Sequence, residues 1–378
     1  MTGREKIEAA LSPAGAAEIP VVIPYQEIMA RDHWEQLTTL PWWHMDAPDA
    51  ERQFEWRRQM LEELDQDWFN IFPWSSRAET RNVEIEERPD GVFRIDRRTG
   101  AEERLVKAPP GGGCGDVLGQ TQLPMPETFE EIDRAIPLKS DFDPKDVLRK
   151  GRGELAAKLM ERFGERLYPL CYVSPPLFPC CEIWGFENLM VMVATRPDLA
   201  RHAFDRMVER NMRAIRSMAL LGAAGVFIED CYSDMLHPAS WEALCLPALR
   251  RMVEEIRALG MRSLHYFCGN PAGKWELLLA TGADALGLEE SKKGFTADVE
   301  ELAERCRGRC AVMGNLDAIG VLAKGTEEEL RSQVARQISA GRRNGGRFIL
   351  SLGSPVTPAT PIERVRQYLR LAREIGKD

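Results

Sequence analysis

The sequence predicts an α/β fold, a (β/α)8 TIM barrel with an inserted β meander. From about residue 196, long amphipathic stretches alternate with short apolar runs, which is typical of parallel βα units. Each apolar run ends in polar or chemically unusual residues, and a barrel collects such residues at the carboxyl ends of its strands. An open doubly wound sheet would also alternate, but the chain has no Gly-x-Gly-x-x-Gly or Walker loop. We therefore predict one barrel domain over residues 1–378.

The carboxyl-terminal half shows the alternation most regularly. Helices are expected at 196–221, 241–259, 271–281, 296–306 and 326–341, and strands at 225–228, 262–264, 284–288, 310–313 and 348–350.

The amino-terminal half is less regular. A leading helix precedes a strand expected at 19–24, and a second strand is expected at 68–72. Between about 82 and 108 the pattern changes to a period of two around a Pro-Asp-Gly turn, which indicates antiparallel strands. This pattern predicts a β meander at 82–108, inserted within the barrel.

Composition narrows the class of protein. The 378 residues are 44% hydrophobic and 29% charged, as in globular proteins, and the net charge of -9 argues against a nucleic-acid partner. No apolar run approaches the roughly 20 residues that span a membrane, and the first residues form no signal peptide, so we predict a cytoplasmic protein without a membrane partner. Nine cysteines, an odd number, favour reduced thiols over a disulfide framework.

Several motifs in the carboxyl half follow one another in a characteristic order. They are Ile228-Glu229-Asp230, His265-Tyr266-Phe267-Cys268-Gly269-Asn270, Gly314-Asn315-Leu316-Asp317 and the segment 349–361. In order and spacing the chain resembles the uroporphyrinogen decarboxylase superfamily, most closely its corrinoid-dependent methyltransferase branch. The resemblance implies a (β/α)8 barrel and one of two chemistries: porphyrinogen decarboxylation, or zinc-dependent methyl transfer to or from a corrinoid protein.

The resemblance implies certain charged residues for porphyrinogen decarboxylation, and this chain has other residues at those places. The decarboxylases have an arginine-rich segment after the first strand, but the matching segment of this chain, 24–31, lacks that set of arginines. They also have an Asp after the second strand, and the matching segment here, 69–74, contains no Asp. Ser354 stands where the decarboxylases place a His. A substrate with many carboxylates needs guanidinium groups, because burying unpaired charge is costly. Methyl transfer is therefore favoured.

The methyltransferase branch implies a zinc ion held by His-x-Cys and by a Cys after the last strand. Here His265 and Cys268 are one residue further apart, and Ser354 replaces the last Cys. Glu289 matches the zinc-binding Glu of the similar cobalamin-independent methionine synthases, and Cys231 is available nearby. We predict zinc ligands His265, Cys268, Glu289 and Cys231, since sulfur and imidazole suit zinc. The alternative is a buried histidine beside an inert cysteine.

Other polar and aromatic residues are candidates for catalysis and substrate binding. The predicted catalytic residues are Glu229, Asp230, Tyr25 and Asn315, since carboxylates at a barrel rim suit proton transfer. The predicted substrate-binding residues are Gln26, Trp43, Trp74 and His237, because an aromatic wall can hold a methoxylated ring or a quaternary ammonium. The alternatives are helix capping and turn roles for the polar residues, and core packing for the tryptophans.

These observations predict a corrinoid-dependent methyltransferase. It would move a methyl group between a small methylated substrate, such as an aromatic methyl ether or a methylamine, and a corrinoid carried by a partner protein, with zinc or an acid group at the barrel rim. The direction of transfer stays open. One alternative is a decarboxylase that acts on another substrate, and another is a non-catalytic barrel that binds a ligand or a corrinoid protein.

Overall fold

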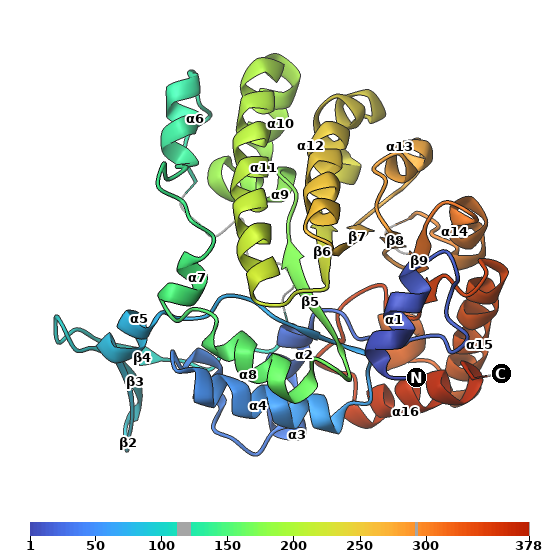
Figure 1. Cartoon of the computed structure of the whole chain (residues 1–378), viewed down its shortest axis with the longest axis horizontal. Coiled ribbons are helices and arrows are strands. Elements are labelled where there is room, and N and C mark those ends of the chain that lie inside the picture. The colour runs from blue at the N-terminus through green and yellow to red at the C-terminus, as the bar shows by residue number, and fades with distance from the viewer. Residues whose placement is uncertain (112–121, 292–293, 378) are drawn as a thin grey trace.

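A curled parallel sheet forms the centre of the molecule (Figure 1). The computed structural model describes residues 1–111, 122–291 and 294–377. The sheet has seven strands in the order β1-β5-β6-β7-β8-β9-β10, and every neighbouring pair is parallel. The strands are Trp68–Asn70 (β1), Tyr168–Val173 (β5), Gly225–Asp230 (β6), Arg262–Phe267 (β7), Ala285–Leu288 (β8), Ala311–Met313 (β9) and Phe348–Ile349 (β10).

The segment 20–23 connects the two edges of this sheet. Val21 forms a parallel bridge with Leu350, and the Val22 N–H donates to the Leu350 carbonyl at 2.9 Å. On the other side, the Asp67 N–H donates to the Val21 carbonyl at 2.9 Å, just before β1. The segment therefore takes the place of an eighth strand, and the predicted (β/α)8 barrel is confirmed.

Helices cover the outside of the sheet (Figure 1). They are Gly3–Leu11 (α1), Gln26–Asp32 (α2), Trp34–Leu37 (α3), Trp42–Asp46 (η1), Ala50–Glu63 (α4), Arg77–Asn82 (α5), Phe129–Ala135 (α6), Asp146–Arg149 (α7), Glu154–Phe163 (α8), Leu177–Trp184 (α9), Phe186–Thr195 (α10), Pro197–Leu220 (α11), Ser233–Met235 (η2), Pro238–Ala258 (α12), Trp275–Leu279 (α13), Val299–Cys306 (α14), Ala318–Ala323 (η3), Glu327–Arg343 (α15) and Ile362–Ile375 (α16).

Local sequence explains where several helices begin. Thr2 with Glu5, and Thr326 with Glu329, form capping boxes that satisfy free N–H groups at the starts of α1 and α15. In the part of the chain that the structure describes, no single helix is long and apolar enough to cross a membrane. Helices α9 and α10 together reach that length and composition, but they meet at an angle of 112°.

Strand alternation divides the buried side chains into two cores. On β6, Val226 and Ile228 join the core between sheet and helices, whereas Phe227 joins the core inside the barrel. On β7, Leu264 and Tyr266 likewise point inside. Helix α1 adds apolar side chains to the interior core, so it closes the amino-terminal end of the barrel. The same alternation decides which side chains reach the open mouth at the other end.

A small antiparallel sheet projects from the barrel (Figure 1). Its strands are Val83–Arg88 (β2), Gly91–Asp96 (β3) and Glu102–Leu105 (β4), in the order β2-β3-β4. Arg88 on β2 pairs with Glu102 on β4 at 2.8 Å, across the central strand. The sheet lies within the range 82–108.

Candidate functional site

Two cysteines meet at the carboxyl-terminal mouth of the barrel. Strands β6 and β7 pair in register up to Asp230 and Phe267, so the next residues, Cys231 and Cys268, lie side by side. Their sulfur atoms are 3.1 Å apart, and the Cys231 thiol donates a hydrogen bond to Cys268. The Glu229 carboxylate, two residues before Cys231 and on the same inward face, lies 3.8 Å from the Cys231 sulfur. Two thiols and a carboxylate thus form the centre of the candidate site.

Burial and acidic neighbours together raise the pKa of the Cys268 thiol. The hydrogen bond from Cys231 lowers the pKa of Cys268, but burial and the nearby carboxylates outweigh it, so the net pKa lies above the ordinary value. The largest of these carboxylate effects comes from Glu229, followed by Glu289. A cation bound here would reverse this balance, because positive charge favours the thiolate.

Tyr25 faces this group from the segment that closes the barrel. Its ring packs edge-on against Phe227 at 6.5 Å and against Tyr266 at 6.4 Å. Burial, together with the neighbouring charge of Cys268, holds the pKa of Tyr25 well above its usual range, so the phenol stays a hydrogen-bond donor. Its backbone is left-handed, with φ 57°. Strain of this kind costs about 1–3 kcal/mol in a non-glycine residue and is concentrated at functional sites.

A second polar group lies at the ends of β1 and β5. The Asn70 amide donates to Glu27 Oε2 at 2.8 Å. Burial raises the pKa of Tyr172 well above its ordinary value, and the Glu27 carboxylate adds to this effect. Asn70 and Tyr172 occupy inward positions on their strands, so strand alternation was a signal that could have found them. The predicted catalytic set included neither.

His265 lies on the other face of β7 and is not placed to share a metal with Cys268. Successive strand residues point to opposite faces, so two residues that are three apart cannot share one. The His265 Nε2 atom lies 3.2 Å from Asp230 Oδ2, and both residues are only 1% exposed. In this structure His265 and Asp230 therefore lie together behind the strands and away from Cys268, and their predicted ligand and rim roles stay predictions that this geometry does not favour. Tyr266 takes the inward position two residues before Cys268.

The other predicted ligands remain near the mouth, but they do not form a metal centre in this structure. Burial raises the pKa of Tyr266, and the charges of Cys268 and Glu289 add to this effect. Across residues 1–111, 122–291 and 294–377, no three His, Cys, Asp or Glu side chains form a group that could hold a metal ion. Ser354, where a third thiol was expected, donates to Glu290 Oε2 at 2.9 Å.

Asn315 has a structural role instead of the predicted catalytic one. Its amide donates to the Glu289 carbonyl at 3.1 Å and to the Ala297 carbonyl at 2.7 Å, and it accepts a hydrogen bond from Gln337 at 3.2 Å. These bonds fix the chain that follows β8, including the backbone of Glu289.

Three of the four predicted substrate-binding residues also have other contacts. Gln26 is 2% exposed, and its amide lies 3.5 Å from the Trp68 carbonyl. His237 accepts the Ala239 N–H at 3.2 Å and so caps α12. Trp43 is buried, with the Arg52 guanidinium 5.3 Å from its ring centroid. These contacts assign Gln26 and Trp43 to packing and His237 to capping.

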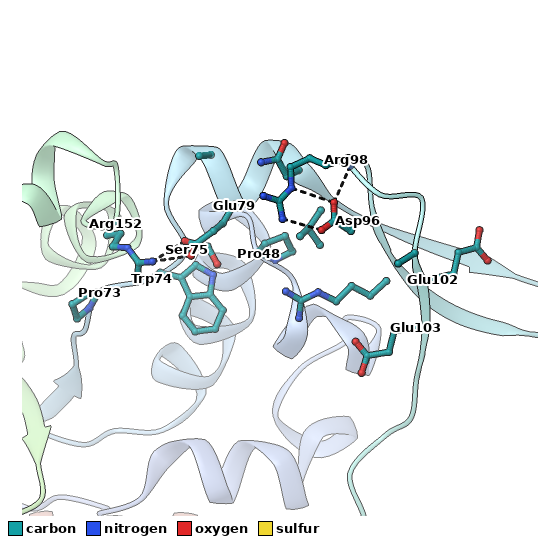
Figure 2. Close-up of a pocket in the computed structure, with 15 residues that line it drawn as sticks. Pro48, Pro73, Trp74, Ser75, Glu79, Asp96, Arg98, Glu102, Glu103 and Arg152 are labelled. Carbon is teal, nitrogen blue, oxygen red and sulfur yellow. Dashed lines mark hydrogen bonds and ion pairs between the residues drawn. The ribbon is translucent and has the colours of Figure 1, made fainter. Parts of the chain in front are cut away.

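Trp74 lines a separate cleft between the barrel and the meander (Figure 2). The cleft has a volume of about 550 Å3, and the Trp74 indole donates to the Ala47 carbonyl at 3.3 Å. Two ion pairs lie in the lining of this cleft: Arg152 pairs with Glu79, and Arg98 pairs with Asp96 (Figure 2). Inside the barrel, Tyr25, Phe227 and Tyr266 pack against one another below the thiols.

Comparisons with known proteins agree with the predicted resemblance. Residues 156–375 match the uroporphyrinogen decarboxylase (URO-D) family profile. Uroporphyrinogen decarboxylases of Prochlorococcus marinus and Trichodesmium erythraeum are 25% and 27% identical, over 76% and 78% of this chain and 79% and 82% of theirs. A solved structure of a methyltransferase from Methanosarcina mazei has the same fold, with a TM-score of 0.66 and 17% identity over 99% of this chain and 98% of that one.

Proposed function

We propose that this chain, which belongs to the uroporphyrinogen decarboxylase (URO-D) family, transfers a methyl group between a small methylated compound and a corrinoid on a partner protein. The observation that carries this proposal is the pair of thiols at the barrel mouth, with Glu229 beside it. The methyltransferase from Methanosarcina mazei supports it by sharing the fold over nearly the whole of both chains. A cytoplasmic location suits such a site, because thiols stay reduced there.

Zinc stays a prediction for this site, because two thiols suit it but no three His, Cys, Asp or Glu side chains among the described residues already form a group that could hold it. Cys231 and Cys268 supply soft sulfur ligands, and the Glu229 carboxylate is the third donor closest to them. When bound, zinc supplies Lewis-acid stabilisation of the atom that gains or loses the methyl group.

The chain's own residues bind the substrate and handle the proton. Demethylation of an ether or an amine leaves an oxygen or nitrogen that must gain a proton. The protonated Tyr25 phenol is a donor beside the thiols, and Glu229 is the nearest carboxylate to relay the proton. Phe227 and Tyr266, whose rings stack at 5.3 Å, form an apolar floor that excludes water below the methyl group.

A methyl-transfer assay tests the proposal directly. Free reduced cobalamin serves as methyl acceptor, methoxylated benzoates and mono-, di- and trimethylamine serve as donors, and methylcobalamin is measured by absorption. We expect one donor class to react, Cys268→Ser to reduce the rate at least 100-fold and Tyr25→Phe to reduce it about 10- to 100-fold. Asp205→Asn, on the exposed face of α11, is the matched control. Ligand binding without turnover in every assay would favour the non-catalytic barrel.

Decarboxylation is the second candidate, because the relatives compared above are uroporphyrinogen decarboxylases. Against it, the stretch 69–74, where those enzymes are expected to have an Asp, contains none, and Ser354 stands where they are expected to have a His. Incubation with uroporphyrinogen and analysis for coproporphyrinogen distinguishes the two. Appreciable coproporphyrinogen would overturn the methyltransferase proposal.

A further inference from the structure

We propose that Cys231 and Cys268 are a modification site, a thiol pair that a small disulfide such as oxidised glutathione converts reversibly into an intramolecular disulfide. The proposal does not depend on methyl transfer, and it concerns the protein freed of metal by a chelator, because a bound zinc would occupy the same two thiols.

The backbone already places the two residues at a distance that a disulfide can span. They follow the last registered pair of β6 and β7, and the Cys268 N–H donates to the Asp230 carbonyl at 2.9 Å, which extends the ladder to them. Neighbouring strands lie roughly 4.8 Å apart, and disulfides join Cα atoms that are about 4.4–6.8 Å apart. The sulfur atoms, now 3.1 Å apart, must approach to about 2.05 Å. Rotation of the side chains provides this movement, so the strands need not shift.

The pair is also the accessible one among the cysteines that the structure describes. Cys231 and Cys268 are half-buried, whereas Cys171, Cys180, Cys181, Cys245, Cys306 and Cys310 are buried. Tyr232, the residue after Cys231, is 38% exposed, so the surface lies close to this end of the strand. These two half-buried thiols are therefore the ones that a small disulfide would meet before the six buried cysteines.

The two thiols act in turn. Their sulfur atoms lie 3.1 Å apart, and the single S–H of Cys231 can point to Cys268 or to Glu229, so we assign the first attack to Cys268, which gives up its proton. It forms a bond with one sulfur of oxidised glutathione and releases the first glutathione thiolate, which takes up a proton. Cys231 then loses its proton and attacks the Cys268 sulfur, and the second glutathione leaves. Two protein thiols are oxidised, and one glutathione disulfide is reduced to two glutathione molecules.

The experiment is a peptide map of the full chain. The purified protein, freed of metal by a chelator, is incubated with excess oxidised glutathione, remaining thiols are alkylated, and tryptic peptides are analysed by mass spectrometry. Cys268 lies in peptide 263–274 and Cys231 in peptide 217–250. We expect these two peptides to be joined, two fewer thiols to be alkylated than in the untreated protein, and dithiothreitol to reverse both changes.

Three variants locate the bond. Peptide 217–250 also contains Cys245, so Cys245→Ala is the matched control and should give the same joined peptides. Cys231→Ser should instead retain glutathione on Cys268, because the second step is lost, and Cys268→Ser should give no joined peptides. Persistent glutathione adducts on the unsubstituted protein, or loss of the joined peptides in Cys245→Ala, would overturn the proposal. Since the map measures no methyl transfer, failure of the proposed function would leave its result unchanged.

Discussion

Replacing His265 with alanine tests whether this side chain is structural. The imidazole is buried on the outward face of β7, with its Nε2 atom 3.2 Å from Asp230 Oδ2. Its removal leaves the Asp230 carboxylate buried without this hydrogen-bond partner, and an unsatisfied buried polar group costs about 1–3 kcal/mol. The charge of Lys274 also acts on Asp230 and compensates in part, so we expect about 2 kcal/mol. That is a large part of the roughly 5–15 kcal/mol that stabilises a domain.

Urea unfolding followed by circular dichroism measures this effect. His265→Ala should lower the urea concentration at which half the protein is unfolded. The slope of the free energy of unfolding against urea concentration should change little, which would show that stability has changed and the compactness of the unfolded state has not. Cys268→Ser, at a half-buried position on the opposite face, should cost less than about 1 kcal/mol. In zinc titrations, Cys268→Ser should lose affinity, and folded His265→Ala should retain it. A His265→Ala protein with unchanged stability and abolished zinc binding would refute the assignment of the two faces.

Three further substitutions give separate tests. Asn315→Ala leaves two main-chain carbonyls without their amide donor, so it should cost about 1–3 kcal/mol in urea unfolding, and unchanged stability would contradict its structural role. Gly341→Ala places a Cβ atom 2.5 Å from Phe348 Cγ, and this overpacking should lower stability by about 1–3 kcal/mol, whereas a neutral result would show that α15 and β10 can separate. Partial desolvation raises the pKa of the Asp46 carboxyl although the residue is exposed, so its ionised form opposes folding only weakly. Asp46→Asn should therefore raise the urea midpoint at pH 7, with the gain disappearing near pH 3, where the carboxyl is protonated in both states. A gain that is equal at both pH values would exclude this cause.

Sequence periodicity predicted the long elements well and the short ones poorly. The helix expected at 196–221 is α11, Pro197–Leu220, because one amphipathic pattern continues without a break. The helix expected at 271–281 shortens to α13, Trp275–Leu279. Gly273, with φ 74°, forms a turn before it, and composition alone does not distinguish such a turn from the first turn of a helix.

The candidate site was predicted in position but not in orientation. Glu229 and Cys231 lie at the expected strand end, and so does Cys268. The two sulfur atoms lie 3.1 Å apart because of the register of β6 against β7. That register cannot be derived from the sequence of either strand alone. Sequence reasoning therefore found the residues but not their partners.

The spacing of His265 and Cys268 shows how one extra residue changes the chemistry of a strand end. A His-x-Cys pair has both side chains on one face, whereas the spacing found here turns the histidine towards the helices, where it binds Asp230. The inward position goes to Tyr266, whose hydroxyl donates to the Gly353 carbonyl and so ties the end of β7 to the segment after β10. The mouth thereby has a fixed aromatic ring where an imidazole ligand was expected. Its second soft donor comes from the neighbouring strand, because the register of β6 places Cys231 next to Cys268.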